Sequence, residues 1–192
     1  MKSYAISDKT NLDFNNLEAS IKRIASKASM ILYRDKNNPN YEENSKLFLQ
    51  TAKKYPFEKI LLHSDYDLAL KLKADGIHLT STQIDDIPLA KEKGLFVIVS
   101  THTLNEASKA QKLGADMITL SPIYDSPNKG KPIGLDTLKD ITSTLNIPVI
   151  ALGGILTGEQ IQECKNAGAN WFASIRYFYK KIFFCFLGIC SI

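Results

Sequence analysis

The chain has 192 residues, of which 44% are hydrophobic and 23% are charged, and its net charge at pH 7 is +4. This length is enough for one domain with a hydrophobic core and too short for two ordinary domains. The charge is small, and lysines are mixed with acidic residues along helical faces, which argues against a nucleic-acid-binding surface. Cys164, Cys185 and Cys190 are odd in number and lack metal-ligand spacing, so we expect a reducing, cytoplasmic setting. No long apolar segment lies near the N-terminus, and no signal peptide is expected.

Short apolar runs alternate with stretches of helical periodicity along the chain. The apolar runs predict strands at Tyr4–Ser7, Ser29–Tyr33, Glu58–Leu62, Gly76–Leu79, Leu95–Val99, Met117–Leu120, Pro148–Leu152 and Trp171–Ser174. The periodic stretches predict helices at Asn11–Lys27, Asn40–Lys54, Asp65–Lys73, Asp85–Lys93, Thr103–Leu113, Leu135–Leu145 and Glu159–Ala167. Capping boxes, in which Thr precedes Glu or Gln by three residues, support helix starts at Thr103 and Thr157. This alternation is typical of a parallel α/β fold.

Three helix-to-strand junctions resemble one another: Leu72–Gly76 reads LKADG, Leu113–Asp116 reads LGAD, and Ala167–Asn170 reads AGAN. A recurring junction indicates one repeated unit, and eight strands then favour a single, compact (β/α)8 TIM barrel. The chain is shorter than the usual barrel of about 250 residues. A doubly wound open sheet is the alternative, but no Gly-x-Gly-x-x-Gly follows the first strand.

We expect residues 1–178 to form the barrel and residues 179–192 to be an atypical apolar tail that alters the C-terminal helix. The apolar part of the tail is about half of the roughly 20 residues that a membrane-spanning helix needs. It fits a final barrel helix with an unusually apolar face, a non-native terminus from a shifted reading frame, or a weak membrane-surface anchor. We expect no stable membrane association.

In a barrel, catalytic side chains lie at the carboxyl ends of the strands. All three histidines of the chain fall there or in a strand: His63 ends the third predicted strand, His78 lies in the fourth, and His102 follows the fifth. Each could be a structural core histidine, but together they favour a polar pocket in which imidazole exchanges protons near neutral pH. A metal site made of all three is disfavoured, because no ligand pair shares a helical face.

Cations follow two other strands. Arg34 and Lys36 come directly after the second strand, and Lys129 and Lys131 lie in the long polar loop 121–132. A bidentate guanidinium beside an ammonium suits a phosphate or pyrophosphate, whereas we interpret Lys131 as a solvated surface charge. The loop has the composition of a lid over a charged substrate.

Gly153 and Gly154 close the seventh strand just before a helix. Glycine backbone there could approach a phosphate closely, or could simply make a tight turn. No strand ends on a lysine in an apolar setting, which disfavours a Schiff-base aldolase, and the sequence has neither a nucleophile elbow nor a Walker loop.

Five motifs in order resemble the thiamin phosphate synthase/TenI family over residues 1–178. They are Leu32–Lys36 (LYRDK), Ala74–Leu79 (ADGIHL), Val99–Thr103 (VSTHT), Gly114–Asp116 with Ser121–Tyr124 (GAD and SPIY), and Ala151–Ile155 (ALGGI). The resemblance implies a (β/α)8 synthase that joins hydroxymethylpyrimidine pyrophosphate to hydroxyethylthiazole phosphate and releases pyrophosphate with Mg²⁺. In the TenI branch it implies aromatisation of a thiazole phosphate tautomer by proton transfer.

The resemblance also implies roles for particular residues. Arg34 and Lys36 would hold the pyrophosphate, and Lys129 would close on it from the loop. These three and His102 form the predicted catalytic set. The predicted substrate-binding set is His63, His78, Ser100, Thr101 and Ser121, with Gly153, Gly154, Ser174 and Ile175 around the thiazole phosphate.

The sequence departs from the synthase pattern at the metal. Synthases carry Asn-Asp where this chain has His63-Ser64, and an Asp where it has Gln83, so two magnesium carboxylates are replaced and magnesium binding should weaken. Asp65, one place along, is the remaining candidate metal ligand. Synthases also have Gln at the position of Leu32 and Thr-x-Thr-Lys where the loop reads SPNK. Pro122 replaces the histidine of TenI enzymes.

We therefore predict a synthase-like transferase with small phosphorylated pyrimidine and thiazole ligands. The alternatives are a TenI-like tautomerase that uses His63, His78 or His102, and a non-catalytic binder of thiamin precursors. Homo-oligomerisation stays open at this stage.

Overall fold

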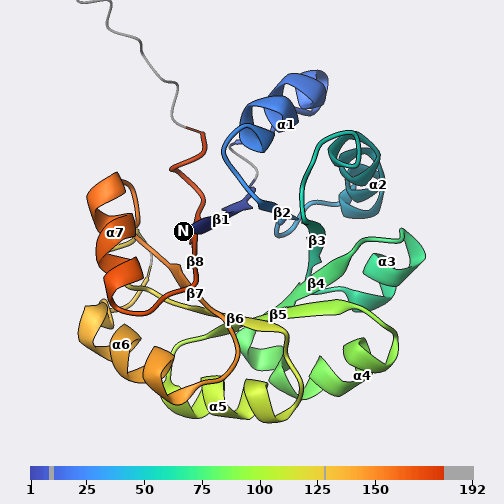
Figure 1. Ribbon diagram of the computed structural model, residues 1–192. Helices are drawn as coiled ribbons and strands as arrows, with labels where there is room; N and C mark the ends of the chain where they lie inside the picture. The colour runs from blue at the N-terminus through green and yellow to red at the C-terminus, as the bar shows by residue number, and fades with distance from the viewer. Residues whose placement is uncertain (9–10, 128, 180–192) are drawn as a thin grey trace, which may run out of the picture.

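The computed structural model describes residues 1–8, 11–127 and 129–179. Its eight strands are all parallel and follow one another around a closed barrel, with the helices on the outside (Figure 1). The first and last strands close the ring through the pairs Lys2–Trp171 to Ala5–Ser174. Closure confirms the predicted (β/α)8 barrel and rules out the open sheet.

The elements lie close to the ranges that the sequence predicts. The strands are β1 (Lys2–Ile6), β2 (Met30–Tyr33), β3 (Lys59–His63), β4 (Gly76–Leu79), β5 (Phe96–Thr101), β6 (Met117–Leu120), β7 (Val149–Leu152) and β8 (Trp171–Ser174). The helices are α1 (Leu17–Ala25), α2 (Tyr41–Ala52), α3 (Tyr66–Lys71), α4 (Ile87–Glu92), α5 (Leu104–Lys112), α6 (Gly134–Thr144) and α7 (Gly158–Asn166). Two 3-10 helices, η1 (Phe14–Asn16) and η2 (Ser81–Asp86), precede α1 and α4. The helices α3 and α4 have only 6 residues each, which shortens the chain that this barrel needs.

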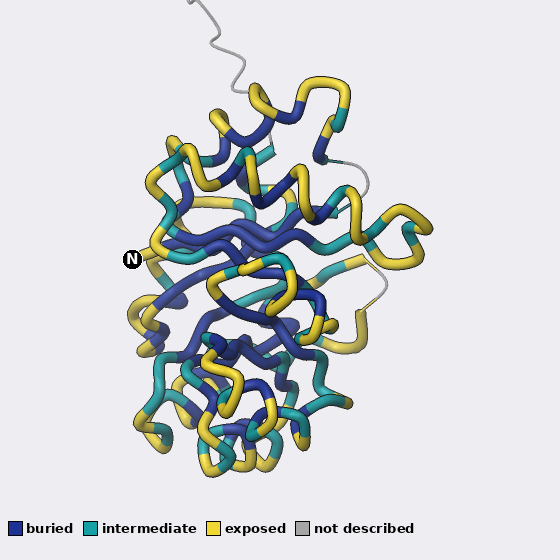
Figure 2. The backbone as a smooth tube through the Cα atoms, turned by 90° about the vertical axis from the view of Figure 1, so that its right-hand side faces the viewer, coloured by how far each residue is buried: buried dark blue, intermediate teal, exposed yellow. Residues whose placement is uncertain are grey.

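Successive side chains of a strand face opposite sides, so every strand divides its residues between two cores. One set points into the barrel and includes Tyr4, Leu32 and Ile98. The alternate set, including Ile31, Tyr33 and Val99, packs under the helices. Figure 2 shows the buried backbone through the middle of the molecule and the exposed segments on the helices and loops. This alternation decides which residues at a strand end reach the barrel mouth.

The three similar junctions have a common structural role. The Asp75 carboxylate accepts a hydrogen bond from the Ile60 backbone N–H, and the Ile60 carbonyl accepts one from the Asp75 N–H. Asp116 makes the same reciprocal pair with Val97, and Asn170 makes it with Val149. Each junction therefore ties the start of one strand to the strand before it. The repeat in the sequence is a register device of the barrel.

After β8 the described chain continues in turns through Tyr179. Residues 180–192, on which the expectations for the tail fall, lie outside the described residues. In the part of the chain that the structure describes, no helix has the length and apolar character needed to cross a membrane.

Candidate active site

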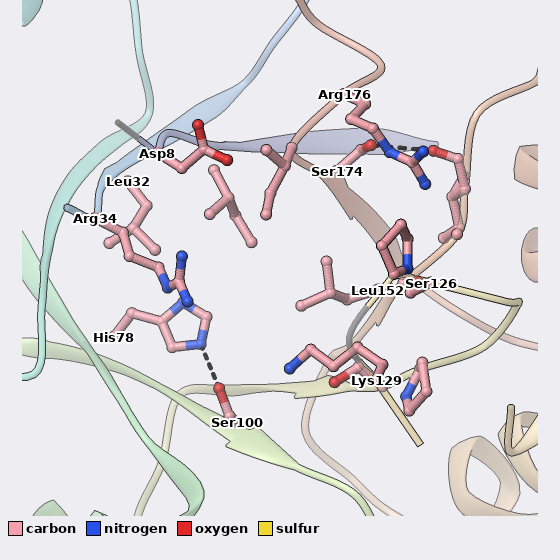
Figure 3. A pocket seen from close by; sticks show the side chains of 18 of the residues that line it. Asp8, Leu32, Arg34, His78, Ser100, Ser126, Lys129, Leu152, Ser174 and Arg176 are labelled. Atoms are coloured by element: carbon pink, nitrogen blue, oxygen red, sulfur yellow. Dashed lines mark hydrogen bonds between the residues drawn. The ribbon is translucent and has the colours of Figure 1, made fainter. Parts of the chain in front are cut away.

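A cavity of about 400 Å³ opens at the carboxyl ends of the strands (Figure 3). This volume is within the range of small-molecule sites. Among the predicted site residues, those that line it are Arg34, Lys36, His63, His78, Ser100, His102, Ser121, Lys129, Gly153, Gly154, Ser174 and Ile175. The barrel therefore gathers residues separated by more than a hundred positions into one site.

His78 is the centre of a buried hydrogen-bonded chain. Its Nδ1 shares a hydrogen bond of 3.0 Å with the Tyr4 hydroxyl, and its Nε2 shares one of 3.1 Å with the Ser100 hydroxyl. Tyr4 comes from β1 and Ser100 from β5, so this chain crosses the barrel interior. Burial lowers the pKa of His78 to about 3, with smaller contributions from His63 and Arg34. The imidazole is thus neutral at physiological pH and holds both hydroxyls in place.

His63 lies next to His78, with a distance of 6.3 Å between the two ring centres. Burial, with smaller contributions from the charges of Arg34 and Lys36, lowers the pKa of His63 to about 4. Both histidines are therefore neutral in the unliganded protein. A neutral imidazole can accept a proton or a hydrogen bond from a ligand.

His102 is fixed by two partners from different segments. Its backbone N–H donates to the Glu106 carboxylate at 2.6 Å, and its Nδ1 donates to the Ser121 carbonyl at 2.7 Å. Because a carbonyl only accepts, Nδ1 carries the proton and Nε2 remains for a ligand. Thr103 caps α5 by accepting from the Glu106 N–H, as predicted, but Glu106 returns its bond to His102 instead of Thr103. The helix cap thereby positions a site residue.

Three cations approach one another at the cavity mouth. Arg34 and Lys129 reach into the cavity from different segments (Figure 3). The positive charge of Arg34, followed by partial burial and Lys129, lowers the pKa of Lys36. The ion pairs of the described residues use other lysines, namely Lys2, Lys54, Lys71, Lys91, Lys93 and Lys109. The cluster of Arg34, Lys36 and Lys129 carries three positive charges in a lining whose one described carboxylate is Asp8, and this excess of positive charge favours a multiply charged anion.

Gly153 and Gly154 make the tight turn that the sequence allowed, whereas their approach to a phosphate stays a prediction. Their φ angles are +100° and +71°, which L side chains rarely adopt. A Cβ on Gly153 would lie 2.7 Å from the Pro122 Cα, and one on Gly154 would lie 2.5 Å from the Asp125 carbonyl oxygen. The glycines thus let the loop after β7 pack on the loop after β6, and they also line the cavity.

Two predicted residues do not line the cavity. Thr101 follows Ser100 in β5, so strand alternation turns its side chain outward, where its hydroxyl donates to the Thr119 carbonyl. Asp65 caps α3, with its carboxylate accepting from the Leu68 N–H at 2.8 Å. Ser174, which was predicted to lie near the thiazole phosphate, does line the cavity, but its hydroxyl already donates to the Ile155 carbonyl and accepts from the Tyr177 N–H.

Several residues that line the cavity were not predicted from the sequence, among them Asp8, Thr80, Ser81, Ser126 and Arg176. Asp8 could have been found, because it continues the inward positions Tyr4 and Ile6 of β1 at an interval of two residues. Arg176 follows β8 beyond its last paired residue, and no pattern in the sequence marked it.

The two positions where synthases carry magnesium carboxylates are in contact here. The Ser64 hydroxyl donates to the Gln83 amide oxygen at 2.8 Å, and the Gln83 amide N–H donates to the Ser64 carbonyl at 2.9 Å. Within residues 1–8, 11–127 and 129–179, no group of three or more His, Cys, Asp or Glu side chains is arranged to hold a metal ion. The donors that are present thus fit a hydrogen-bonded pair better than a site for a hard cation.

Comparison with known proteins gives consistent matches. A family model described as thiamine monophosphate synthase matches residues 3–178. The putative thiamine-phosphate synthase 2 of Aquifex aeolicus strain VF5 is 37% identical over 180 residues, which cover 91% of this chain and 96% of that protein. The thiamine-phosphate synthase of Dictyoglomus turgidum is 34% identical over 83% of this chain and 70% of its own length. The solved thiamine phosphate pyrophosphorylase of Pyrococcus furiosus superposes with a TM-score of 0.79 at 30% identity, covering 91% of this chain and 85% of that one.

Proposed function

Because the chain belongs to the thiamine monophosphate synthase family and is a thiamin-phosphate-synthase-like transferase, we propose that its cavity joins hydroxymethylpyrimidine pyrophosphate to hydroxyethylthiazole phosphate. The bond between the pyrimidine methylene carbon and the pyrophosphate oxygen breaks, and its electron pair leaves with pyrophosphate. The thiazole nitrogen donates its lone pair to the same carbon and becomes positively charged. No proton is gained or lost, so the site must mainly stabilise the leaving group and align the nucleophile.

The observation that carries the proposal is the cluster of three cations, Arg34, Lys36 and Lys129, in the cavity lining. Negative charge grows on pyrophosphate as the bond breaks, and fixed cations offset it most strongly in the transition state. The crowding that lowers the pKa of Lys36 is relieved when an anion enters. Three neighbouring positive charges repel one another, so such a cluster would be unfavourable in a site for a neutral ligand.

The rest of the cavity lining offers contacts for the pyrimidine ring and for the thiazole phosphate. The Ser100 hydroxyl, held by neutral His78, and the free Nε2 of His102 offer polar partners for a pyrimidine ring. The glycines after β7 offer backbone approach for the thiazole phosphate near Ser174 and Ile175. The proposal assigns the pyrimidine to the histidine side and the thiazole phosphate to the side of β7 and β8.

The resemblance implies Mg²⁺ as cofactor, which would supply positive charge to the leaving pyrophosphate. Asp8 is the one carboxylate among the described lining residues, and Asp65 is occupied as a helix cap. Hard cations require several oxygen ligands, preferably anionic. This donor set does not fit a protein-held magnesium ion, and no step of the proposed reaction is assigned to one.

A second candidate is proton transfer on a thiazole phosphate, as in a TenI-like tautomerase. The neutral state of His63 and His78 favours it, because a neutral imidazole can serve as a general base. A non-catalytic binder of phosphorylated thiamin precursors would use the same pocket without turnover. For each of these candidate functions we propose that the protein is cytoplasmic. Its homo-oligomerisation stays a prediction.

The test is an incubation of the protein with both substrates, with and without Mg²⁺, in which thiamin phosphate is followed by its fluorescent oxidation product. Product formation that is lost in R34A and kept in K131A would support the transferase, since Lys131 is exposed and does not line the cavity. If wild-type protein gives no product under either condition, the synthase reaction is wrong. His63→Gln and His78→Gln variants then separate a tautomerase from a binder.

A further inference from the structure

Ser64, which directly follows His63, is hydrogen-bonded to Gln83, and both side chains are neutral where a metal site would need charge. We infer that Ser64 and Gln83 form a latch that replaces a metal site, and that side chains alone neutralise the leaving pyrophosphate. The transferase would then work without a protein-bound divalent cation. This inference rests on the proposed function.

The latch is a closed set of hydrogen bonds. The Gln83 amide oxygen accepts from the Ser64 hydroxyl at 2.8 Å, from the Thr80 hydroxyl at 3.0 Å and from the Thr80 N–H at 3.2 Å. The amide nitrogen donates to the Ser64 carbonyl at 2.9 Å. The Ser64 N–H in turn donates to the His78 carbonyl at 3.0 Å. The latch therefore ties the end of β3 to the end of β4.

These bonds leave little for a metal ion. An amide oxygen that already accepts three hydrogen bonds has no lone pair free for coordination, and it is neutral. A magnesium ion would have to break the latch and lose those bonds, and it would gain only weak, uncharged ligands. The Ser64 carbonyl is also occupied by Gln83. The same contacts that order the strand ends exclude the ion.

The charges on the cavity wall supply what the metal would have supplied. Arg34, Lys36, Lys129 and Arg176 line the cavity, whereas Asp8 is the one carboxylate among the described lining residues. Arg34 comes from the end of β2 and Lys129 from the loop after β6, so an anion between them would be contacted from two directions (Figure 3). Guanidinium and ammonium groups bind phosphate oxygens directly. The wall is thus suited to metal-free pyrophosphate.

The experiment uses the full chain and measures pyrophosphate binding by calorimetry in EDTA and in Mg²⁺. The variant S64D/Q83D restores two carboxylates, and S64N/Q83N is its matched neutral control. Ser64 has φ +71°, a conformation that Asp and Asn adopt more readily than most residues. The backbone therefore suits both Ser64→Asp and Ser64→Asn. Thermal unfolding and circular dichroism confirm that each variant is folded.

We expect wild-type protein and S64N/Q83N to bind pyrophosphate in EDTA, with affinities within about threefold of those in Mg²⁺. S64D/Q83D should bind about tenfold more weakly in EDTA, because two carboxylates beside the cavity lining residues His63 and Thr80 repel the anion, and it should recover in Mg²⁺. Product formation by the wild type should also persist in EDTA.

Wild-type binding that appears only with Mg²⁺ would overturn the inference, whatever the variants do. Absence of pyrophosphate binding in both conditions would instead contradict the proposed function, because the cation cluster would then not be an anion site. If S64D/Q83D does not fold, the wild-type comparison in EDTA and Mg²⁺ decides the question alone.

Discussion

The two sides of the cavity differ in how deeply their side chains are buried and in how those side chains are held. The histidine wall consists of His63, His78 and His102, which are partly or fully buried. Hydrogen bonds to Tyr4, Ser100 and Ser121 hold the rings of His78 and His102. The cation cluster of Arg34, Lys36 and Lys129 is more exposed, and its members repel one another. The histidine wall is thus ordered by contacts within the protein, whereas the cation cluster would be ordered by the ligand that it binds.

The difference follows from what each side must bind. A planar ring is recognised by fixed partners, so its wall gains from being rigid before binding. A pyrophosphate brings several charges, and cations that remain solvated lose less on binding than cations already paired with carboxylates. The contrast predicts that changes in the cation cluster will affect turnover and that changes in the histidine wall will affect stability.

The largest effect is expected at Arg34. R34A removes the only guanidinium at the end of β2, and we expect the rate of product formation to fall about 10²–10³-fold, as when one charge-stabilising group is lost from a transition state. The thermal midpoint should change little, since Arg34 is only partly buried and lies in the cavity lining outside the two cores. Steady-state kinetics of R34A beside K131A would measure this. Equal rates for both variants would remove Arg34 from the mechanism.

The buried histidines His63 and His78 should make the free energy of unfolding depend on pH. His63 and His78 have folded-state pKa values of about 4 and about 3, below the ordinary value of 6.5. Between pH 6.5 and the folded pKa values the unfolded chain binds more protons, so the free energy of unfolding should fall as pH falls, by about 1.4 kcal/mol per pH unit for each histidine. Denaturant titrations between pH 7 and pH 5 measure the slope.

The matched variant is His78→Gln, which keeps a donor and an acceptor but does not titrate. Its slope over the same pH range should be smaller than that of the wild type by about one proton, whereas carboxylate titrations cancel in the difference. Parallel slopes for the two proteins would mean that His78 is not held neutral by the fold.

The smallest effect separates the two lysines of the loop. Lys129 lines the cavity and Lys131 does not. K129A should weaken pyrophosphate binding about tenfold, and K131A should leave it within about twofold, because an exposed charge away from the ligand is screened. Calorimetry at an ionic strength of about 0.15 M, where the Debye length is about 8 Å, measures both. Equal losses would indicate a general charge effect instead of a contact.

Much of the fold could be read from local patterns. Apolar runs and capping signals placed the strands, and the three similar junctions pointed to a repeated unit before their hydrogen bonds to Ile60, Val97 and Val149 were known. The predicted start of the first helix at Asn11 was too early, because Asp13 caps η1 and α1 begins only at Leu17. Local periodicity does not show where a helix changes type.

The candidate site depended more on tertiary structure. Ser100 and Thr101 are adjacent polar residues, and the sequence could not tell them apart. Strand alternation turned Ser100 into the barrel and Thr101 toward the helices. Asp65 kept the chemistry of a metal ligand, but its place at the start of α3 used that carboxylate as a cap.

The sequence by itself determined the parallel α/β alternation, the family and the residue types that meet at the strand ends, because these depend on short-range pattern and composition. Only the tertiary structure decided that the sheet closes, that Ser64 and Gln83 touch, and that Arg34, Lys36 and Lys129 share one space. The reason is physical: barrel closure brings together groups distant in sequence, and their charges and hydrogen bonds take effect only at that distance.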